Sequence, residues 1–252
     1  MILDQVIRAT AGRVAGLPGK AADYPERRGH HSLHAVLGRR CGRNAIISEI
    51  KFASPSRGSI REEIDPVGMA AGMTSAGCAA LSVLTEPYFF NGRPEFIPAI
   101  RSGVTIPILR KDFIIDERQL AESRALGADA ILLIAGVLGD HLPDMVDAAF
   151  AHGLEPLVEV HTAGEVKAAL RTTTRMVGIN NRDLRTLAID LSTTVRLAPL
   201  VRDAGLSIVS ESGFLWPCDV RGLRHLVDGY LIGSAIMAAR DPAKALEGFI
   251  FA

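Results

Sequence analysis

Cysteine is scarce in this chain of 252 residues. The three cysteines, Cys41, Cys78 and Cys218, are odd in number, widely spaced and form no CxxC pair. This pattern argues against both a disulfide framework and a zinc site. We therefore expect no metal ion, and a reducing, cytoplasmic location is the simplest interpretation.

An excess of charge and a long apolar run are also missing. The 28 basic residues balance the 28 acidic ones, so the formal net charge is zero. Nothing therefore attracts the chain as a whole to nucleic acid or to an anionic membrane, and an anionic ligand must be bound by a local arrangement. The first 17 residues carry Asp4, Arg8 and Arg13 and do not resemble a signal peptide. No run of about 18 apolar residues occurs that could span a membrane.

The sequence is instead rich in short apolar segments that alternate with longer helical patterns, as in βα units. Eight segments are predicted to be strands: 45–51, 79–85, 106–111, 128–134, 154–160, 176–180, 206–212 and 229–234. Predicted helices include 66–76, 116–126, 139–152, 191–203 and 242–249. Eight such units predict a closed (β/α)8 TIM barrel. A doubly wound sheet is less consistent with the sequence than a barrel, because no GxGxxG motif follows the first predicted strand.

An N-terminal extension precedes the regular pattern. Residues 2–15 show apolar positions at helical spacing and predict an amphipathic helix, while residues 17–44 resemble a loop with a possible helix near 31–38. No low-complexity linker interrupts the chain. We therefore expect a single domain over 1–252, with a helical extension over 1–44 that covers part of a barrel over 45–252.

Charged and polar residues are concentrated where the predicted strands end. They are Glu49, Lys51, Lys111, Glu159, Asn180, Arg182, Glu211 and Ser212. The active sites of such barrels lie at the carboxyl ends of the strands. Alternation along a strand places Leu109 with Lys111 and Leu157 with Glu159, so apolar partners inside the barrel direct the charges to its mouth. An ion-pair network at the rim is the alternative for any one of them.

Small residues follow the last two predicted strands. Ser212-Gly213 and Gly233-Ser234 allow backbone N–H groups to approach a ligand, and a short helix could begin at Ser234. Barrels often bind phosphate between these two loops. The substrate is therefore predicted to be a small phosphorylated molecule.

Several segments together resemble indole-3-glycerol-phosphate synthases. The segment from Ser48 to Ser56 is similar to the EIKxxSPS signature of that family, and residues 178–184 are similar to its INxRDL motif. Further similarities are Leu84-Thr85-Glu86 with Phe90-Asn91-Gly92, residues 109–113, 158–161 and 210–213. Tyr88 stands where the family commonly has lysine. The resemblance implies ring closure of 1-(2-carboxyphenylamino)-1-deoxyribulose 5-phosphate, with loss of CO2 and water, in tryptophan biosynthesis and without a cofactor or metal.

The resemblance also assigns roles. Lys111 corresponds to the general acid and Glu159 to the base for dehydration. Lys51 is placed to neutralise substrate anions while Glu49 keeps it charged, and Asn180 and Arg182 suit the ring carboxylate and the developing hydroxyl group. Glu211 and Ser212 flank the site. The expected phosphate contacts are Ser54, Gly213, Gly233 and Ser234, and Phe90 and Phe113 pack either on the aromatic ring or in the core.

Other functions remain possible from the residues alone. A ribulose-phosphate epimerase or phosphoribosylanthranilate isomerase explains the Gly-Ser loops, but not Glu49, Lys51 and Ser54 combined with Lys111 and Glu159. A non-catalytic barrel that retains phosphate binding is the alternative outside the enzymes. The HHxxH cluster of His30, His31 and His34 has no carboxylate or cysteine nearby and is not interpreted as a metal site. We expect a monomer or weak homodimer that binds a sugar phosphate, and neither nucleic acid nor membrane.

Overall fold

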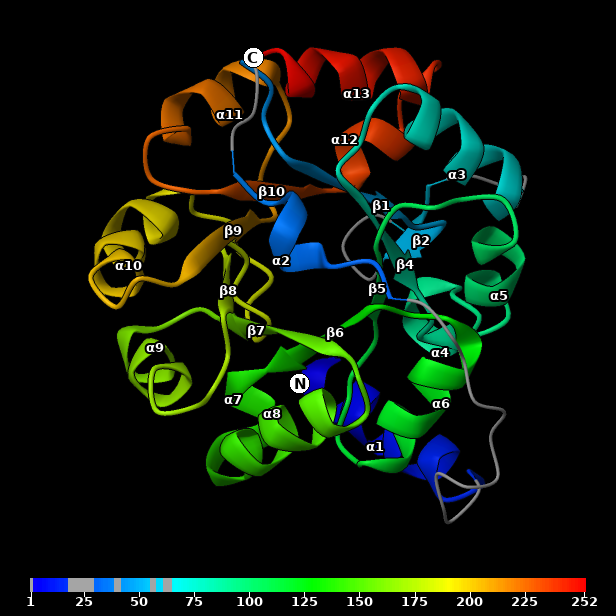
Figure 1. Ribbon diagram of the computed structural model, residues 1–252, viewed down its shortest axis with the longest axis vertical. Coiled ribbons are helices and arrows are strands. Elements are labelled where there is room, and N and C mark those ends of the chain that lie inside the picture. Colours follow the sequence, from blue (N-terminus) through cyan, green and yellow to red (C-terminus); the bar gives the residue numbers. More distant parts are fainter. Residues whose placement is uncertain (1, 18–29, 39–41, 55–57, 61–64) are drawn as a thin grey trace.

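Eight parallel strands close into a barrel in the computed structural model, which describes residues 2–17, 30–38, 42–54, 58–60 and 65–252 (Figure 1). The strands are β1 (Ile46–Ile50), β4 (Ala80–Leu84), β5 (Ile108–Lys111), β6 (Ala130–Ile134), β7 (Glu155–Val160), β8 (Met176–Asn180), β9 (Ser207–Glu211) and β10 (Gly229–Ile232). They follow the order β1-β10-β9-β8-β7-β6-β5-β4, and pairing of β4 with β1 completes the ring. The (β/α)8 prediction and its eight strands are confirmed.

Helices surround this barrel. The longer ones are α3 (Pro66–Ser75), α5 (Phe96–Arg101), α6 (Arg118–Leu126), α8 (Leu142–Ala151), α9 (Ala163–Ala169), α10 (Ser192–Arg202), α11 (Pro217–Leu223) and α13 (Pro242–Ile250). Shorter helices are α4 (Pro87–Phe90), α7 (Ala135–Leu138), the 3-10 helix η2 (Gly139–His141) and α12 (Ser234–Met237). The five predicted helices of the barrel region are confirmed. A two-stranded hairpin, β2 (Ala53–Ser54) with β3 (Gly58–Ser59), was not predicted.

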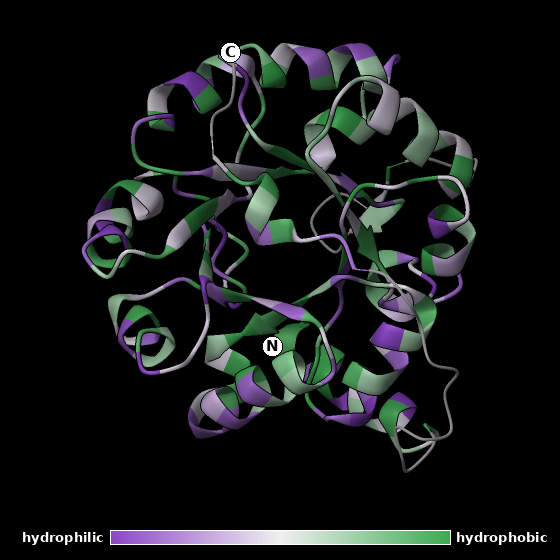
Figure 2. Cartoon of the chain, in the orientation of Figure 1, coloured by the Kyte–Doolittle hydropathy of each residue, from purple (hydrophilic) through white to green (hydrophobic). Residues whose placement is uncertain are grey.

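The hydrophobic core has two layers. One lies between the strands and the outer helices, whose surfaces carry both hydrophobic and hydrophilic residues (Figure 2). The other fills the barrel and includes Ile47, Leu109, Leu157 and Val209, one from every second strand of the ring. Stacked layers of four side chains from alternate strands are usual in such barrels. The barrel is therefore packed solid below its mouth.

The N-terminal extension reaches both ends of the barrel. Helix α1 (Ile2–Val14) is tied by Arg13 to Asp112, just beyond the carboxyl end of β5. Helix α2 (Leu33–Val36) lies over the centre of the barrel in Figure 1, at the opposite end, where Leu33 is buried in the interior cluster. Ser32 Oγ and the N–H of His34 donate to the carboxylate of Glu155, at the start of β7. None of the helices in the described ranges combines the length and the hydrophobicity that a transmembrane span needs.

Candidate active site

A cavity of about 320 Å³ opens at the carboxyl ends of the strands. Twelve of the fourteen predicted site residues line it, namely Glu49, Lys51, Phe90, Lys111, Phe113, Glu159, Asn180, Arg182, Ser212, Gly213, Gly233 and Ser234. Glu211 joins this group through an ion pair with Lys111. Ser54 is the exception, because its side chain lies outside the described part of the structure. The sequence prediction therefore corresponds to one place in the fold.

Three carboxylates surround one ammonium group at the top of the barrel. Lys111 Nζ lies 2.9 Å from Glu211 Oε2 and 3.5 Å from Glu159 Oε2. Glu49, Lys111, Glu159 and Glu211 lie on β1, β5, β7 and β9, which again are every second strand of the ring. Each stands two residues beyond a member of the apolar layer formed by Ile47, Leu109, Leu157 and Val209. Because side chains alternate along each strand, these four charged residues form the layer directly above the apolar one, at the mouth of the barrel.

The charged side chains in this layer shift the pKa values of one another. Burial opposes the charged form of Lys111, but Glu211, Glu159 and Glu49 outweigh burial and raise the pKa of the ammonium group. Burial raises the pKa of Glu211 to about 7, although Lys111 acts in the opposite direction. Burial also opposes ionisation of Glu49, but Lys51 and Lys111 hold the pKa of Glu49 below its usual value. The neighbouring carboxylates therefore favour the charged, protonated form of Lys111.

Hydrogen bonds fix the side chains next to Lys111. Asn180 Nδ2 donates to Glu159 Oε1 at 3.0 Å, and Asn180 Oδ1 accepts from the N–H of Arg182 at 2.9 Å. Lys51 Nζ lies 2.6 Å from Glu49 Oε1. Each predicted catalytic carboxylate is thus held by a named partner, so the geometry of the site is set before a ligand binds.

The other wall of the cavity is apolar. Ile2, Leu3 and Val6 of α1 line it, together with Phe90 and Phe113, whose ring centroids are 6.2 Å apart at an interplanar angle of 36°. Leu132, Ile134, Leu184 and Leu187 complete this wall. An apolar wall opposite convergent charges suits a ligand with a flat hydrophobic part and an anionic part.

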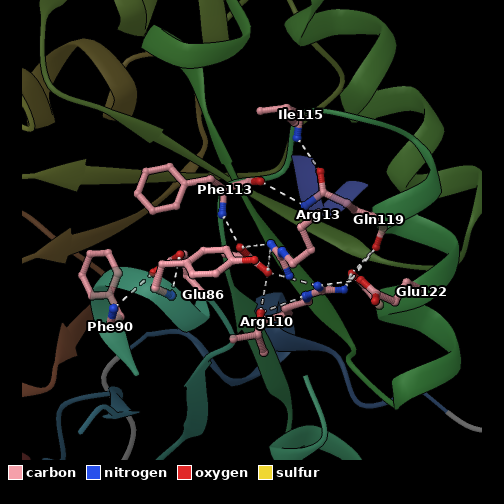
Figure 3. Close-up of polar contacts among 12 residues, drawn as sticks. Arg13, Glu86, Phe90, Arg110, Phe113, Ile115, Gln119 and Glu122 are labelled. Carbon is pink, nitrogen blue, oxygen red and sulfur yellow. Dashed lines mark hydrogen bonds and ion pairs between the residues drawn. The ribbon is translucent and has the colours of Figure 1, made fainter. Parts of the chain in front are cut away.

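Glu86 sets the position of Phe90. Its carboxylate is buried and accepts hydrogen bonds from the N–H groups of Tyr88, Phe89 and Phe90, which caps α4 (Figure 3). These bonds measure 3.0, 2.7 and 3.1 Å. Sequence reasoning quoted Glu86 only as part of a motif and did not predict this role, because Glu is not a usual N-cap residue.

A second buried network lies behind Phe113. Asp112 accepts two hydrogen bonds from Arg13, at 2.7 and 2.8 Å, as well as hydrogen bonds from Thr85 and Arg110. Arg110 extends the network to Glu122 on α6 at 2.7 Å. Burial opposes ionisation, but Arg110 and Arg13 hold the pKa of Asp112 below its usual value. This cluster joins α1 to the residue that follows Lys111, and the sequence pattern gave no signal of it.

The loops after β9 and β10 approach the cavity closely. Ser212 has a φ of +64° and Gly213 a φ of +92°, so two consecutive residues adopt the left-handed region. A Cβ at position 213 would lie 2.8 Å from Ile189 Cγ2, and one at position 233 would lie 2.9 Å from Glu49 Cβ. Side chains at these two positions would close the space that glycine leaves open.

The predicted absence of a metal site is not contradicted. In the described residues no group of three or more His, Cys, Asp or Glu side chains is arranged to hold an ion. His31 and His34 lie instead at the closed end of the barrel, where their backbone N–H groups donate to Asp129 and Glu155. Cys41, Pro55 and Ser56 fall outside the described residues.

Solved structures with similar folds include two proteins at low sequence identity. A structure of KGPDC from Streptococcus mutans has a TM-score of 0.65 at 14% identity and matches 82% of this chain and 95% of that one. 3-Hexulose-6-phosphate synthase from Salmonella typhimurium has a TM-score of 0.66 at 14% identity, over 81% of this chain and 96% of its own. These similarities support the fold alone.

Sequence comparison is more specific. Residues 13–249 match the family model described as indole-3-glycerol phosphate synthase. Proteins with that name are 47% identical in Carboxydothermus hydrogenoformans, over 82% of this chain and 79% of the relative, and 49% identical in an Azoarcus species, over 84% and 82%. The relative from Methanopyrus kandleri is 38% identical over 98% of this chain and 97% of its own. With the charged layer, the apolar wall and the glycine loops in one cavity, the chain belongs to the indole-3-glycerol phosphate synthase family.

Proposed function

We propose that the chain converts 1-(2-carboxyphenylamino)-1-deoxyribulose 5-phosphate to indole-3-glycerol phosphate, releasing CO2 and water. The observation that carries this proposal is the position of Lys111, a charged ammonium between Glu159 and Glu211, in a cavity with one apolar wall. An aromatic ring and a sugar phosphate in one substrate need such a divided cavity.

The cavity gives each part of the substrate a place. The aromatic ring packs between Phe90, Phe113 and the apolar residues of α1. The ring carboxylate meets Lys51 and Arg182, which supply positive charge and a planar pair of donors. The phosphate group binds to the backbone of Ser212-Gly213 and Gly233-Ser234, with Ser54 as a further contact.

Lys111 acts as the general acid in the first step. The ring carbon that bears the carboxylate attacks the ketone carbon, and a C–C bond forms while the ketone oxygen takes a proton from Lys111. The carboxylate then leaves as CO2, and its bonding electrons restore the aromatic ring. A positioned acid of this kind contributes on the order of 10²–10⁴ to the rate.

Glu159 acts as the base in the dehydration. The new hydroxyl group takes a second proton from the ammonium group of Lys51, which lines the same cavity, and leaves as water. Glu159 accepts a proton from the neighbouring carbon, where the double bond of the indole forms. Asn180 donates to Glu159 and keeps one of its oxygens in place. Glu49 keeps Lys51 charged, and Glu211 does the same for Lys111.

The proposal also covers the setting of the reaction. We propose one domain over residues 1–252, active in the cytoplasm as a monomer or weak homodimer, without a metal, a cofactor, nucleic acid or membrane. The contacts of α1 and α2 with opposite ends of the barrel support the single domain. Sedimentation of the purified protein over a range of concentrations tests the oligomeric state.

Indole fluorescence tests the reaction. The purified protein is mixed with the substrate in the presence of EDTA, and fluorescence is expected to rise as product forms. Lys111→Ala should lower kcat by about 10²–10⁴ while the circular dichroism spectrum stays unchanged. Lys167, exposed on α9, gives the matched control, and Lys167→Ala should retain full activity. Absence of turnover by the wild-type protein, or normal turnover by Lys111→Ala, would refute the proposal.

A further inference from the structure

Asn181 follows Asn180 in the chain but does not line the cavity. It comes directly after β8, and its side chain is completely buried. None of the roles proposed above involves Asn181. A buried amide must place two donor hydrogens and an acceptor oxygen, so the location of its partners is informative.

The amide nitrogen of Asn181 is directed at the end of the neighbouring strand β9. Asn181 Nδ2 lies 3.0 Å from Ser210 Oγ, 3.0 Å from the carbonyl oxygen of Glu211 and 3.1 Å from that of Ser212. Its backbone N–H also donates to Glu211 O at 2.9 Å. One side chain therefore contacts three consecutive residues, the last of which begins the turn that lines the cavity.

The amide oxygen of Asn181 is directed the other way. Asn181 Oδ1 accepts from the N–H and the hydroxyl group of Thr194 on α10, at 3.1 and 2.8 Å. Thr194 therefore supports the amide from outside the barrel and touches neither Glu211 nor Ser212 through these bonds. The Thr194 hydroxyl group also lies 2.6 Å from Ser210 Oγ, so Thr194 reaches the start of the Asn181 contacts on β9 but not the carbonyl groups of Glu211 and Ser212. The amide oxygen can thus be perturbed while the donors to these two carbonyl groups are kept.

The turn that Asn181 contacts is conformationally unfavourable. Ser212 carries a Cβ and adopts φ +64°, where residues other than glycine are uncommon. Such a conformation persists only where the surroundings enforce it. The bond from Asn181 to the Ser212 carbonyl group is such a restraint, because it fixes the peptide group between Ser212 and Gly213.

We propose that Asn181 is a positioning residue that holds the Ser212-Gly213 turn in the conformation that binds the phosphate group of the substrate. It acts through Ser212 and does not touch the substrate. This inference rests on the proposed phosphate contacts at Ser212 and Gly213. Loss of Asn181 therefore weakens phosphate binding more than it slows the chemical steps at Lys111 and Glu159.

The test compares Asn181→Asp with Thr194→Val. Asn181→Asp keeps the shape of the side chain but removes the donors to the Glu211 and Ser212 carbonyl groups. Thr194→Val removes only the hydroxyl group on the far side of the amide. If Asn181→Asp does not fold, as judged by circular dichroism, Asn181→Ala replaces it, because alanine also removes these donors and adds no buried charge.

Two constants are measured for each variant. One is KM for the full substrate, together with kcat. The other is the Kd of inorganic phosphate, followed by the fluorescence of Trp216, the single tryptophan of the chain. Asn181→Asp should raise both KM and Kd by about tenfold and change kcat by less than about threefold, because the buried hydrogen bond that holds the Ser212 carbonyl group is lost. Thr194→Val should lower Tm and leave both constants within about twofold of the wild-type values.

A rescue experiment tests the part played by Ser212. Glycine enters the left-handed region without the steric penalty of serine. In a Ser212→Gly background, Asn181→Asp should therefore raise the Kd of phosphate by no more than about threefold. The Ser212→Gly single variant supplies the reference values.

The outcomes separate this inference from the proposed function. Absence of turnover with normal phosphate binding by the wild-type protein would refute the proposed reaction, and the phosphate Kd would still decide the role of Asn181. An unchanged Kd and KM in Asn181→Asp, or an equal rise of both in Thr194→Val, would overturn the role of Asn181.

Discussion

Lys111 and Glu211 form an ion pair across the full width of the barrel. Their strands, β5 and β9, are four places apart in a ring of eight, yet Lys111 Nζ lies 2.9 Å from Glu211 Oε2. Glu211 Oε1 is buried and has no hydrogen-bond partner in the part of the chain that is described. Glu211 is therefore satisfied on one side only, which is consistent with its raised pKa.

The raised pKa of Glu211 predicts a pH dependence of stability. Because burial raises this pKa from 4.5 to about 7, the folded state keeps a proton between pH 4.5 and 7 that the unfolded state has released. The free energy of unfolding therefore falls as pH rises through this window. Glu211→Gln cannot titrate, so from pH 5 to pH 8 it should gain on the order of 1–3 kcal/mol relative to wild type. Urea unfolding at both pH values measures the difference, and parallel pH profiles would contradict the prediction.

Gly178 provides the space that Glu211 occupies. A Cβ at position 178, on β8, would overlap Glu211 Oε1, which lies against the backbone there. Gly178→Ala should therefore displace the Glu211 carboxylate and lower kcat by about tenfold or more, with a loss of stability of about 1–3 kcal/mol. The control is Gly222→Ala on α11, where a Cβ meets nothing within 4 Å. Equal kcat values for Gly178→Ala and Gly222→Ala would contradict the prediction, because they would show that the position of the Glu211 carboxylate does not affect turnover.

Arg13 should control how α1 closes the apolar wall. Removing it leaves Asp112 buried with one cationic partner fewer, and it releases the helix that carries Ile2, Leu3 and Val6. Arg13→Ala should raise KM by about tenfold and lower stability by about 1–3 kcal/mol. Arg13→Lys keeps the charge but loses the planar fork, so its KM and stability should fall between those of wild type and Arg13→Ala. Arg8→Ala, at an exposed position on the same helix, is the control; a KM as high as that of Arg13→Ala would remove the special role of Arg13.

Glu86 should affect the aromatic wall in the same way. Glu86→Ala removes the acceptor for three N–H groups of α4 and should lower stability by about 1–2 kcal/mol, as loss of an N-cap does. Because Phe90 belongs to that helix, KM should also rise. Glu86→Gln retains an acceptor oxygen and should restore most of both losses. Glu95, at the start of α5, makes no side-chain cap and supplies the comparison, so a similar change in Glu95→Ala would argue against capping as the cause.

The strands and the inward direction of the charges could be predicted from the sequence because both follow from alternation. Leu109 and Leu157 fill the barrel, so Lys111 and Glu159, two residues further along, must point to its mouth. Strand order also followed, since consecutive βα units place parallel strands side by side. The family motifs added the roles, which alternation alone does not provide.

Contacts between distant segments could not be predicted in this way. Arg13 meets Asp112 across 99 residues, and nothing in the periodicity of α1 indicates that partner. Arg110 is buried on the outer side of β5, where a charged residue is expected only with partners that the fold alone reveals. The turn at Ser212 was recognised for its small residues, but its left-handed conformation and its hydrogen bond from Asn181, which follows β8, were not predicted.

Because Glu49, Lys111, Glu159 and Glu211 come from every second strand, no pair of neighbouring strands contains two of them. A partly assembled sheet therefore leaves these charges separated and hydrated, and the last step of ring closure brings three carboxylates around one ammonium. Ring closure is opposed by the cost of desolvating these charges, while hydrogen bonding between the paired strands favours ring closure. Recovery of enzyme activity during refolding should consequently report closure of the ring, and it should lag behind the recovery of helical circular dichroism.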